Sequence, residues 1–474
     1  MTATEPDTQP AASHNAPRAS GGRRVWRKVA LGAAALAVAG GATLGWFLAF
    51  PAQAPAAMGR WIEDTTGANP HPVKLLRPAE KPLSVLAQVG QKLFFDPSLS
   101  ASGKQSCASC HDPARAFGPP TARDVELGGI AMDQEGLRPP PGLTYLYRQK
   151  GFTIGPSTAD LDVPIPLDQL ADKAQTQARQ VKSAGTPAEA SALVPAGGLF
   201  WDGRIDMLMD QAMGPMMNPA EMANKDRFAV VDKLRRLPYL AQLGRLFGQH
   251  TLDRPEMLFI EAMSALSAYQ VESGAFHRFN SKYDAWLEGK ERLTHAEMRG
   301  LRLFNDPEKG NCAACHLSQP AADGLPPLFT DSEFEALGVP RNPRLKVNRD
   351  PAFFDMGLCG PARQDLARQT QYCGMFLTPT LRNSARRGVY FHNGVYHNLR
   401  DVLNFYNQRA AHPEKVYPRD AQGRLLIYND LPAKYHGNID VADAPFTQKR
   451  GDTPPLSDAD IDDIIAFLHT LDDR

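Results

Sequence analysis

The chain has 474 residues, with 52 basic and 52 acidic side chains and therefore a formal net charge of zero. This length allows two or three domains. The balanced charge, without a basic stripe or an acidic tail, excludes nucleic acid and charged polymers as expected partners.

The N-terminal segment is expected to hold the chain at a membrane. Residues 1–28 are predicted to be a disordered cytoplasmic tail, because the first 21 lack the apolar content of a core. Residues 29–50 contain no charged side chain and are long enough to cross a ~30 Å hydrocarbon core. They predict a transmembrane signal anchor, and the basic residues before it place the remaining chain on the periplasmic side of the inner membrane.

A cleavable signal peptide is the alternative for this segment. Ala52, Gln53 and Ala54 offer a small-x-small cleavage sequence. Both interpretations place the body of the protein outside the cytoplasm. Residues 51–78 are predicted to be a linker.

Two copies of one pentapeptide dominate the folded part, "CASCH" and "CAACH". Their chemically important residues are Cys107, Cys110 and His111 in the first copy and Cys312, Cys315 and His316 in the second. Two thiols can bond the vinyl groups of a porphyrin, and the histidine that follows can ligate its iron. A zinc site would need two more Cys or His nearby, and the remaining cysteines lie far from the first copy. We therefore predict two covalently bound haem c groups.

The flanking sequence is repeated as well. "GQKLFFDP" precedes the first copy and "GLRLFNDP" the second, and each half closes with a predicted amphipathic helix, after Pro255 and after Ser457. The chain is thus an internal duplication. We predict an all-α fold of two tandem cytochrome c-type domains, a peroxidatic haem domain over residues 79–280 and an electron-transfer haem domain over residues 281–474.

Two further elements come from the second half. Cys359 and Cys373 are free to form a disulfide, which is expected in an oxidising compartment; two unpaired buried thiols are the alternative. "NLRDVLNFYNQR" predicts a helix that carries Leu399, Val402, Leu403 and Tyr406 on one face. Tyr406 is therefore a phenol on an apolar face.

Several motifs occur together in order: "LFFDPSLSASGKQSCASCH", "GGLFWDGR", "TPTLRN", "YFHNG" and the terminal helix. With them the chain, over roughly residues 80–474, resembles the bacterial dihaem cytochrome c peroxidase family, including its MauG branch. The resemblance implies a first haem with His111 as proximal ligand and an open opposite position. It implies Glu221 as the acid/base for peroxide, Gln211 beside it, and Trp201 between the two haems. A solvated Glu221, a surface Gln211 and a core Trp201 are the alternatives.

The resemblance also bears on the sixth ligand of each iron. No histidine lies between His111 and His250, so the first haem is expected to be five-coordinate without reductive activation. Where many family members place Met at the second haem, this sequence places Tyr406, as MauG does. A buried Tyr406 with a satisfied hydroxyl is the alternative, and Met375 or Met356 is then the next candidate ligand.

Three functions remain open at this point. The first is a peroxidase that reduces hydrogen peroxide with electrons from a small donor, a c-type cytochrome or a cupredoxin. The second is a MauG-like enzyme that uses peroxide to oxidise residues of a partner protein. The third is a non-catalytic dihaem electron carrier.

Calcium between the domains is a further open cofactor, since Pro139 stands where the family has an Asn ligand; the carbonyls of Leu377 and Pro379 are possible contributors. Arg382 is a candidate partner for a haem propionate.

Overall fold

The structure is a computed structural model that describes residue 46, residues 56–155 and residues 193–474. The predicted tail and the predicted anchor at residues 29–50 lie outside the described residues, apart from Trp46. Within the described ranges, no helix is both long enough and apolar enough to cross a membrane.

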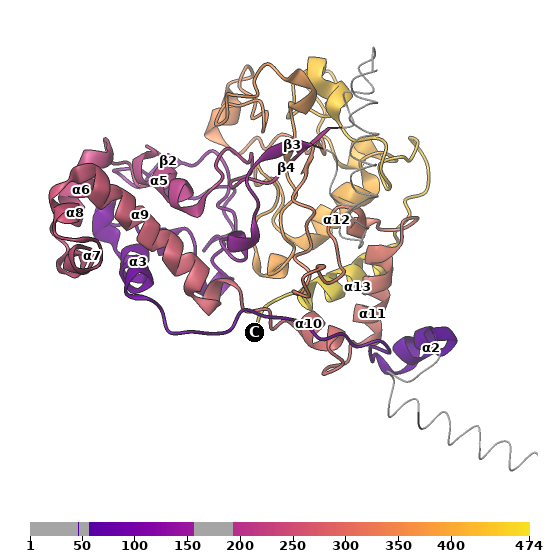
Figure 1. Ribbon diagram of the computed structural model, residues 1–474. Helices are drawn as coiled ribbons and strands as arrows, with labels where there is room; N and C mark the ends of the chain where they lie inside the picture. The colour runs from indigo at the N-terminus through magenta and orange to yellow at the C-terminus, as the bar shows by residue number, and fades with distance from the viewer. Residues whose placement is uncertain (1–45, 47–55, 156–192) are drawn as a thin grey trace, which may run out of the picture.

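One group of helices encloses a hydrophobic cluster in the N-terminal half, which we call the first core. Its helices are α3 (Val85–Phe95), α5 (Leu208–Met217), α6 (Arg227–Leu234), α7 (Ala241–Phe247), α8 (His250–Asp253) and α9 (Pro255–Glu272). They lie together on one side of the molecule (Figure 1). α3 packs along α9, and the side chains between them include Val89, Leu93 and Ala262.

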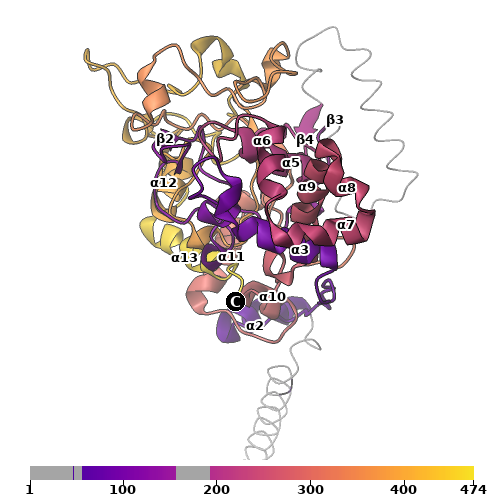
Figure 2. The same cartoon turned by 90° about the vertical axis from the view of Figure 1, so that its left-hand side faces the viewer.

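A second group encloses another cluster, the second core. Its helices are α10 (Lys282–Leu287), α11 (His295–Asn305), α12 (Leu399–Gln408) and α13 (Asp458–His469). Ser457 caps α13 as its side chain accepts a hydrogen bond from the backbone of Asp460. In the view turned by 90° the second group lies behind and below the first (Figure 2).

The repeated glycine of the two flanking motifs explains why both cores are built alike. A Cβ added at Gly90 in α3 would lie 1.8 Å from the carbonyl oxygen of Ala265 in α9. A Cβ added at Gly300 in α11 would lie 1.9 Å from the carbonyl oxygen of Asp463 in α13. Each helix pair therefore crosses at a point where only glycine fits. The duplication seen in the sequence is a duplicated helix crossing.

The fold is helix-rich, as predicted, but it also contains a few short strands that the all-α prediction did not include. The described residues contain three two-stranded antiparallel sheets. The strands are β1 (Leu127–Gly128) with β2 (Gln134–Glu135), β3 (Thr153–Gly155) with β4 (Val194–Ala196), and β5 (Phe334–Glu335) with β6 (Phe376–Leu377). Strands of two or three residues are too short to leave an alternating pattern, which is the signal that predicts a strand.

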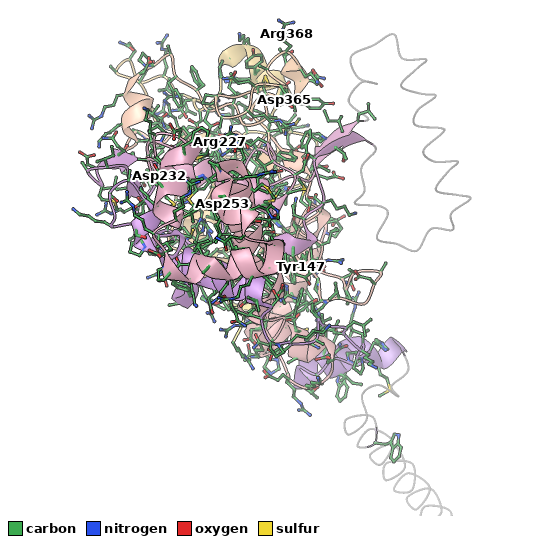
Figure 3. All side chains as sticks on the ribbon, turned by 60° about the vertical axis from the view of Figure 1, so that its left-hand side comes forward. Tyr147, Arg227, Asp232, Asp253, Asp365 and Arg368 are labelled. Atoms are coloured by element: carbon green, nitrogen blue, oxygen red, sulfur yellow. A yellow bond between two sulfur atoms is a disulfide. The ribbon has the colours of Figure 1, made fainter. Side chains whose placement is uncertain are left out.

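Long loops cover the remaining surface. A small third cluster around Phe334, Leu358 and Tyr372 packs beneath β3 to β6. Figure 3 shows Asp365 and Arg368 at the outer end of this loop-rich region, away from the α6 to α9 part where Arg227 lies.

The segment predicted to be a linker, residues 51–78, has structure in its described part. It contains α2 (Ala56–Thr66), and Leu75 belongs to the second core. The carbonyl of Gly67 accepts the indole N–H of Trp286 at 3.1 Å. This segment therefore packs against the second group of helices.

Candidate haem sites

The two CxxCH segments have the same local geometry. In each, three residues form a single 3₁₀ turn, Cys107–Ser109 and Cys312–Ala314. The Nδ1 atom of His111 lies 3.2 Å from the carbonyl oxygen of Phe117, and that of His316 lies 2.8 Å from the carbonyl oxygen of Phe329. A carbonyl can only accept, so Nδ1 carries the proton and Nε2 keeps the free lone pair that a metal needs.

Burial controls the charge of these groups. It lowers the pKa of both His111 and His316 to about 4, so both imidazoles are neutral at physiological pH. It raises the pKa of the Cys107 and Cys312 thiols to about 12. Without a bound cofactor, both sites therefore hold neutral thiols beside neutral imidazoles.

One cavity, which we call the Tyr406 cavity, has a volume of about 220 Å³ and adjoins the second CxxCH segment. Cys312, Cys315 and His316 line it together with the predicted apolar face of α12, namely Leu399, Val402, Leu403 and Tyr406. Met375 and Met356 are not among its lining residues. The structure thus brings Tyr406, and not either methionine, to the cavity of His316.

The Tyr406 phenol lies in an apolar aromatic setting. Its ring stacks on Phe446 with a centroid distance of 5.6 Å. Burial raises its pKa above the ordinary value, and the neighbouring Cys315 and Cys312 raise it further. A phenolate is therefore unfavourable here unless a cation lies next to it, as a ferric iron would.

The second cavity, which we call the Gln211 cavity, has a volume of about 160 Å³. Gln211 and Trp201 line it, as do Ala116 and Gly118, which follow His111 in the chain. His111 and Glu221 are not among its lining residues. The structure therefore places Gln211 and Trp201 together, with the first CxxCH segment adjoining them through residues 116–118.

Glu221 lies near the first CxxCH segment instead. Its negative charge contributes to the raised pKa of both the Cys107 and the Cys110 thiols. Burial raises the pKa of the Glu221 carboxyl, and a hydrogen bond from Asn218 opposes this rise. The Asn218 Nδ2 atom donates to Glu221 Oε1 at 2.5 Å. Sequence reasoning missed Asn218, although its position three residues before Glu221, just after α5, was a usable signal.

Trp201 lines both cavities. Its Nε1 atom donates to the carbonyl of Pro139 at 3.0 Å, and its own carbonyl accepts the backbone N–H of Leu377 at 2.9 Å. The ring and the backbone of Trp201 are thus each anchored in the wall between the cavities. The family resemblance indicated Trp201 as a candidate but did not predict these two anchors.

A buried arginine fixes the same region. Arg138 forms ion pairs with Asp202 at 2.8 Å and with Asp355 at 2.7 Å, and all three side chains are less than a tenth exposed. Asp202 directly follows Trp201, whereas Asp355 belongs to the other half of the chain. This cluster, the Arg138 clasp, therefore ties the two halves together beside the tryptophan.

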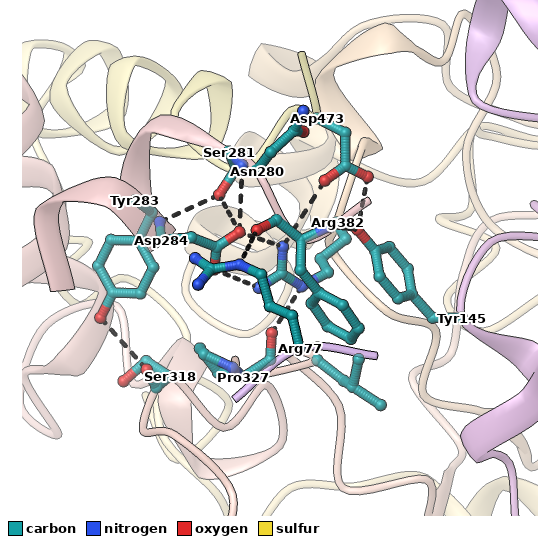
Figure 4. Close-up of polar contacts among 12 residues, drawn as sticks. Arg77, Tyr145, Asn280, Ser281, Tyr283, Asp284, Ser318, Pro327, Arg382 and Asp473 are labelled. Atoms are coloured by element: carbon teal, nitrogen blue, oxygen red, sulfur yellow. Dashed lines mark hydrogen bonds and ion pairs between the residues drawn. The ribbon is translucent and has the colours of Figure 1, made fainter. Parts of the chain in front are cut away.

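Arg382, which we predicted to pair with a haem propionate, is already neutralised. Its Nη1 and Nη2 atoms bond both carboxylate oxygens of Asp284 at 2.9 and 2.6 Å, and Asp473 lies 3.9 Å away. Tyr145 donates to Asp473, so the network joins both halves (Figure 4). Arg382 lines the Gln211 cavity, but its charge is balanced within the protein.

Cys359 and Cys373 are bonded to each other in the structure. Gly374, which follows Cys373, lines the Tyr406 cavity. The disulfide therefore holds Cys373 in place at the start of the segment that continues through Gly374 and β6 along the cavity wall. In the chain-entropy description, a loop of this size contributes roughly 3 kcal/mol.

The residues present fit a c-type haem at both places. Each place offers two adjacent thiols and an imidazole whose Nε2 is free, and the cavity walls are largely apolar. Apolar residues that line the Tyr406 cavity include Phe304, Leu337, Leu381, Ile464 and Leu468. Such walls suit a large flat macrocycle better than a polar metabolite.

The residues fit calcium poorly. The Pro139 carbonyl, the one ligand that a proline offers, already accepts the Trp201 N–H. The adjacent carboxylates of Asp202 and Asp355 are paired with Arg138. A divalent cation at this place would meet the charge of the guanidinium.

Comparison with known proteins identifies the family. A sequence model of the family described as di-haem cytochrome c peroxidase matches residues 84–292. The methylamine utilization protein MauG of Paracoccus denitrificans is 34% identical over 415 residues, which cover 84% of this chain and 90% of that protein. The chain belongs to the dihaem cytochrome c peroxidase family, and is MauG-like.

Other relatives agree with this assignment. The cytochrome c551 peroxidase of Nitrosomonas europaea is 28% identical over 361 residues, covering 75% of this chain and 81% of the relative. The crystal structure of the diheme peroxidase BthA from Burkholderia thailandensis superimposes with a TM-score of 0.70 at 36% identity, covering 85% of this chain and 89% of BthA. Members of this family are haem-containing oxidoreductases that use peroxide, and this chain is therefore an enzyme of that kind.

Proposed function

We propose that this protein reduces hydrogen peroxide at the first haem site, with electrons that a small redox protein delivers through the second site and Trp201. The observation that carries the proposal is the position of Trp201, which lines both cavities. Each cavity adjoins one CxxCH segment. An indole between two redox sites can pass an electron from one to the other.

At the first site, bound haem c would supply an iron that binds peroxide and takes up its oxidising equivalents. His111 would hold that iron through Nε2, with Cys107 and Cys110 as covalent anchors. Glu221 would move a proton between the two peroxide oxygens, and its raised pKa suits a group that both gives and takes a proton. Asn218 would keep Oε1 fixed, leaving Oε2 as the atom that exchanges the proton. The Gln211 amide would orient peroxide or water.

At the second site, His316 and Tyr406 would hold the iron. Their presence on one cavity supports this pairing. A phenolate is a hard anionic ligand that stabilises oxidised iron and lowers its reduction potential, whereas Met raises it. This chain would therefore hold the second site in an oxidised state more easily than a Met-ligated relative.

The same observation favours a second candidate function, a MauG-like oxidation of residues on a partner protein. A second site that stabilises oxidised iron suits the storage of oxidising equivalents and their use on a protein side chain. A non-catalytic electron carrier is disfavoured, since a partly buried carboxyl held by Asn218 beside the first CxxCH segment has no role in simple electron transfer.

Several further features belong to the proposal. Haem is bound covalently at both sites, in a peroxidatic domain of residues 79–280 and an electron-transfer domain of residues 281–474. The disulfide between Cys359 and Cys373 supports a periplasmic location, where disulfides persist. Attachment to the inner membrane through residues 29–50 rests on the sequence alone. Calcium is not part of the proposal, because the residues fit it poorly.

The proposal is tested on the full-length protein as isolated. We expect two haems per chain in a pyridine haemochrome assay, and a high-spin five-coordinate component in the electron-paramagnetic spectrum of the oxidised protein. Peroxide should be consumed without a prior pulse of reductant. Only low-spin haem, with activity that appears after partial reduction, would contradict the open first site.

A second experiment separates the two candidate functions. The enzyme is supplied with peroxide and either a reduced small c-type cytochrome or a reduced cupredoxin. Stoichiometric oxidation of a donor over many turnovers supports the peroxidase. Persistence of the oxidised enzyme in the presence of both donors, with oxidised side chains on a co-purified partner protein, supports the MauG-like function.

A further inference from the structure

One partly buried cation in the wall of the Gln211 cavity has no negatively charged partner among the described residues. Arg387 lines this cavity. Its Nη2 atom donates to the carbonyl of Pro140 at 3.1 Å and its Nε atom to that of Val389 at 3.4 Å. No carboxylate of the described residues lies within ion-pair distance of it, and Nη1 makes no hydrogen bond to a described residue.

The free end of this guanidinium is directed at the cavity wall formed by two glycines. A Cβ added at Gly118 would lie 3.6 Å from Arg387 Nη1, and one added at Gly142 would lie 3.9 Å from it. Both glycines line the Gln211 cavity. The absence of side chains at these positions leaves Nη1 accessible from the cavity.

A second unpartnered group lies on the same turn of the chain. Ser384 is 6% exposed, it lines both cavities, and its Oγ atom has no hydrogen-bond partner among the described residues. A buried hydroxyl without a partner is costly unless something in the cavity accepts its proton. Ser384 and Arg387 thus present an O–H and an N–H to the same space.

The other arginines of this cavity do not share this property. Arg382 is neutralised by Asp284 and Asp473, and Arg115 is exposed to solvent. Burial without a counter-charge lowers the pKa of Arg387 to about 10, partly offset by Tyr390. An enclosed cation with spare donors calls for an anion.

We propose that Arg387 and the Ser384 hydroxyl bind a propionate carboxylate of the haem at the first site. In a c-type haem the thioether bonds hold one edge of the ring, and the two carboxylates lie at the opposite edge. Cys107 and Cys110 do not line the Gln211 cavity, whereas Arg387 and Ser384 do. The cavity therefore lies away from the thiols, where the carboxylates belong.

This inference rests on the proposed function, because it requires haem at the first site. Arg387 would then be a positioning residue. It would set the tilt of the ring through one carboxylate while the thioether bonds fix the other edge.

The test uses the full-length protein loaded with both haems, in buffer free of phosphate and sulfate. The propionate-bending band in the resonance Raman spectrum reports hydrogen bonds to the haem carboxylates. We expect Arg387→Gln to shift this band for one haem of the two, and Arg387→Lys, which keeps the charge, to shift it less. The Ser384→Ala change should produce a smaller shift of the same band.

Arg386→Gln is the matched control. Arg386 directly precedes Arg387 on the same turn, but it pairs with Asp472 and does not line the cavity. An unchanged band in Arg387→Gln or, should that variant fail to fold, in both Arg387→Lys and Ser384→Ala, overturns the inference, as does an equal shift in Arg386→Gln. Added inorganic phosphate distinguishes a free anion: if it stabilises the parent but not Arg387→Gln or Arg387→Lys, an anion from solution occupies the site and the inference is wrong. Fewer than two haems per chain would instead contradict the proposed function.

Discussion

The Tyr406 cavity and the Gln211 cavity adjoin two copies of the same scaffold, yet their walls differ in chemistry. The CxxCH turns, the Nδ1 hydrogen bonds and the glycine crossings are the same in both halves. Around the Tyr406 cavity, the helix α12 contributes a phenol, the strand β5 contributes Glu335 and a loop contributes Asp440. Around the Gln211 cavity, α5 contributes an amide and the loops contribute arginines. The duplication thus repeats the CxxCH scaffold, and the surrounding segments differ in the side chains that they bring to each cavity.

The largest expected effect is at the first site alone. Glu221→Gln keeps the size of the side chain and its bond to Asn218 but removes the titrating proton. We expect peroxide turnover to fall by ~10²–10⁴-fold, the usual contribution of general acid–base catalysis. Steady-state peroxide consumption measures it. Glu126→Gln is the control, a partly buried carboxylate that also lies near Cys110; equal losses in both variants would remove Glu221 from its role.

Removing the Arg138 clasp, which ties the two halves of the chain together, should lower the free energy of unfolding. Arg138→Gln leaves the buried carboxylates of Asp202 and Asp355 without their cation. The free energy of unfolding should fall by about 3–5 kcal/mol, as is typical when a buried ion pair loses one partner. Urea denaturation of this variant is compared with that of Arg148→Gln, whose pair with Asp323 is exposed on both sides and should be worth only ~0–1 kcal/mol. Similar losses of unfolding free energy in the two variants would show that the Arg138 clasp contributes no more than an exposed ion pair.

The second site should respond to its phenol. In Tyr406→Phe the second iron should lose an anionic ligand, and its reduction potential should rise by about 0.1 V, a fraction of the ~0.8 V that axial ligands span. The measurement is a redox titration with electron-paramagnetic spectra. Tyr396→Phe is the control, since Tyr396 packs in the same aromatic group without lining the cavity. Were parent and Tyr406→Phe to share one potential and one low-spin signal, Met375 and Met356 would be the ligands to test.

The two helix crossings should be equally sensitive to substitution of their glycine. Gly90→Ala and Gly300→Ala each force a methyl group against a backbone carbonyl, so each should destabilise the protein by about 1–3 kcal/mol or more. Thermal unfolding measures both. Gly214→Ala in α5 is the control, because its added methyl group would meet only Phe200 at 3.6 Å and should be neutral or stabilising. A large cost in one half only would show that the two crossings are not equivalent.

The smallest expected effect concerns the acidic wall of the Tyr406 cavity. Burial, followed by the nearby Asp440, raises the pKa of Glu335 to about 8. The native state therefore keeps a proton between pH 4.5 and 8 that the unfolded chain loses, so stability should fall as the pH rises through this window.

The expected loss is of the order of 1–3 kcal/mol, since each pKa unit corresponds to about 1.4 kcal/mol. Urea denaturation at pH 5.5 and pH 8.5 measures it, and Glu335→Gln should remove most of the difference. The exposed Glu308→Gln serves as control. If the stability of the parent protein rises over this pH range instead, the predicted effect of Glu335 is wrong.

The sequence predicted those features that depend on local spacing. The CxxCH copies and the duplication are written in runs of a few residues, and the four residues predicted to share one face of α12 all line one cavity. The helix after Ser457 begins where its capping pattern indicates. The pairing of Cys359 with Cys373 could be predicted because the two residues are separated by only a short loop.

Features that depend on distant partners could not be predicted in this way. Arg138 and Asp355 are separated by 217 positions, and no local pattern joins them. Arg382 illustrates the same limit, because its charge suggested a propionate partner while Asp284 neutralises it. Arg387 drew no attention in the sequence, since being unpaired is a property only of the folded chain.

Trp201 belongs to a wall that the two cavities share, and the other residues lining both are Leu377, Thr378, Pro379, Leu381, Ser384, Tyr390 and Phe391. Electron tunnelling weakens steeply with distance, so a relay through Trp201 depends on the bonds that hold its indole at Pro139 and its backbone at Leu377. A smaller residue at this position would do more than remove a relay. It would join two compartments into one chamber, through which water and peroxide could reach the second iron.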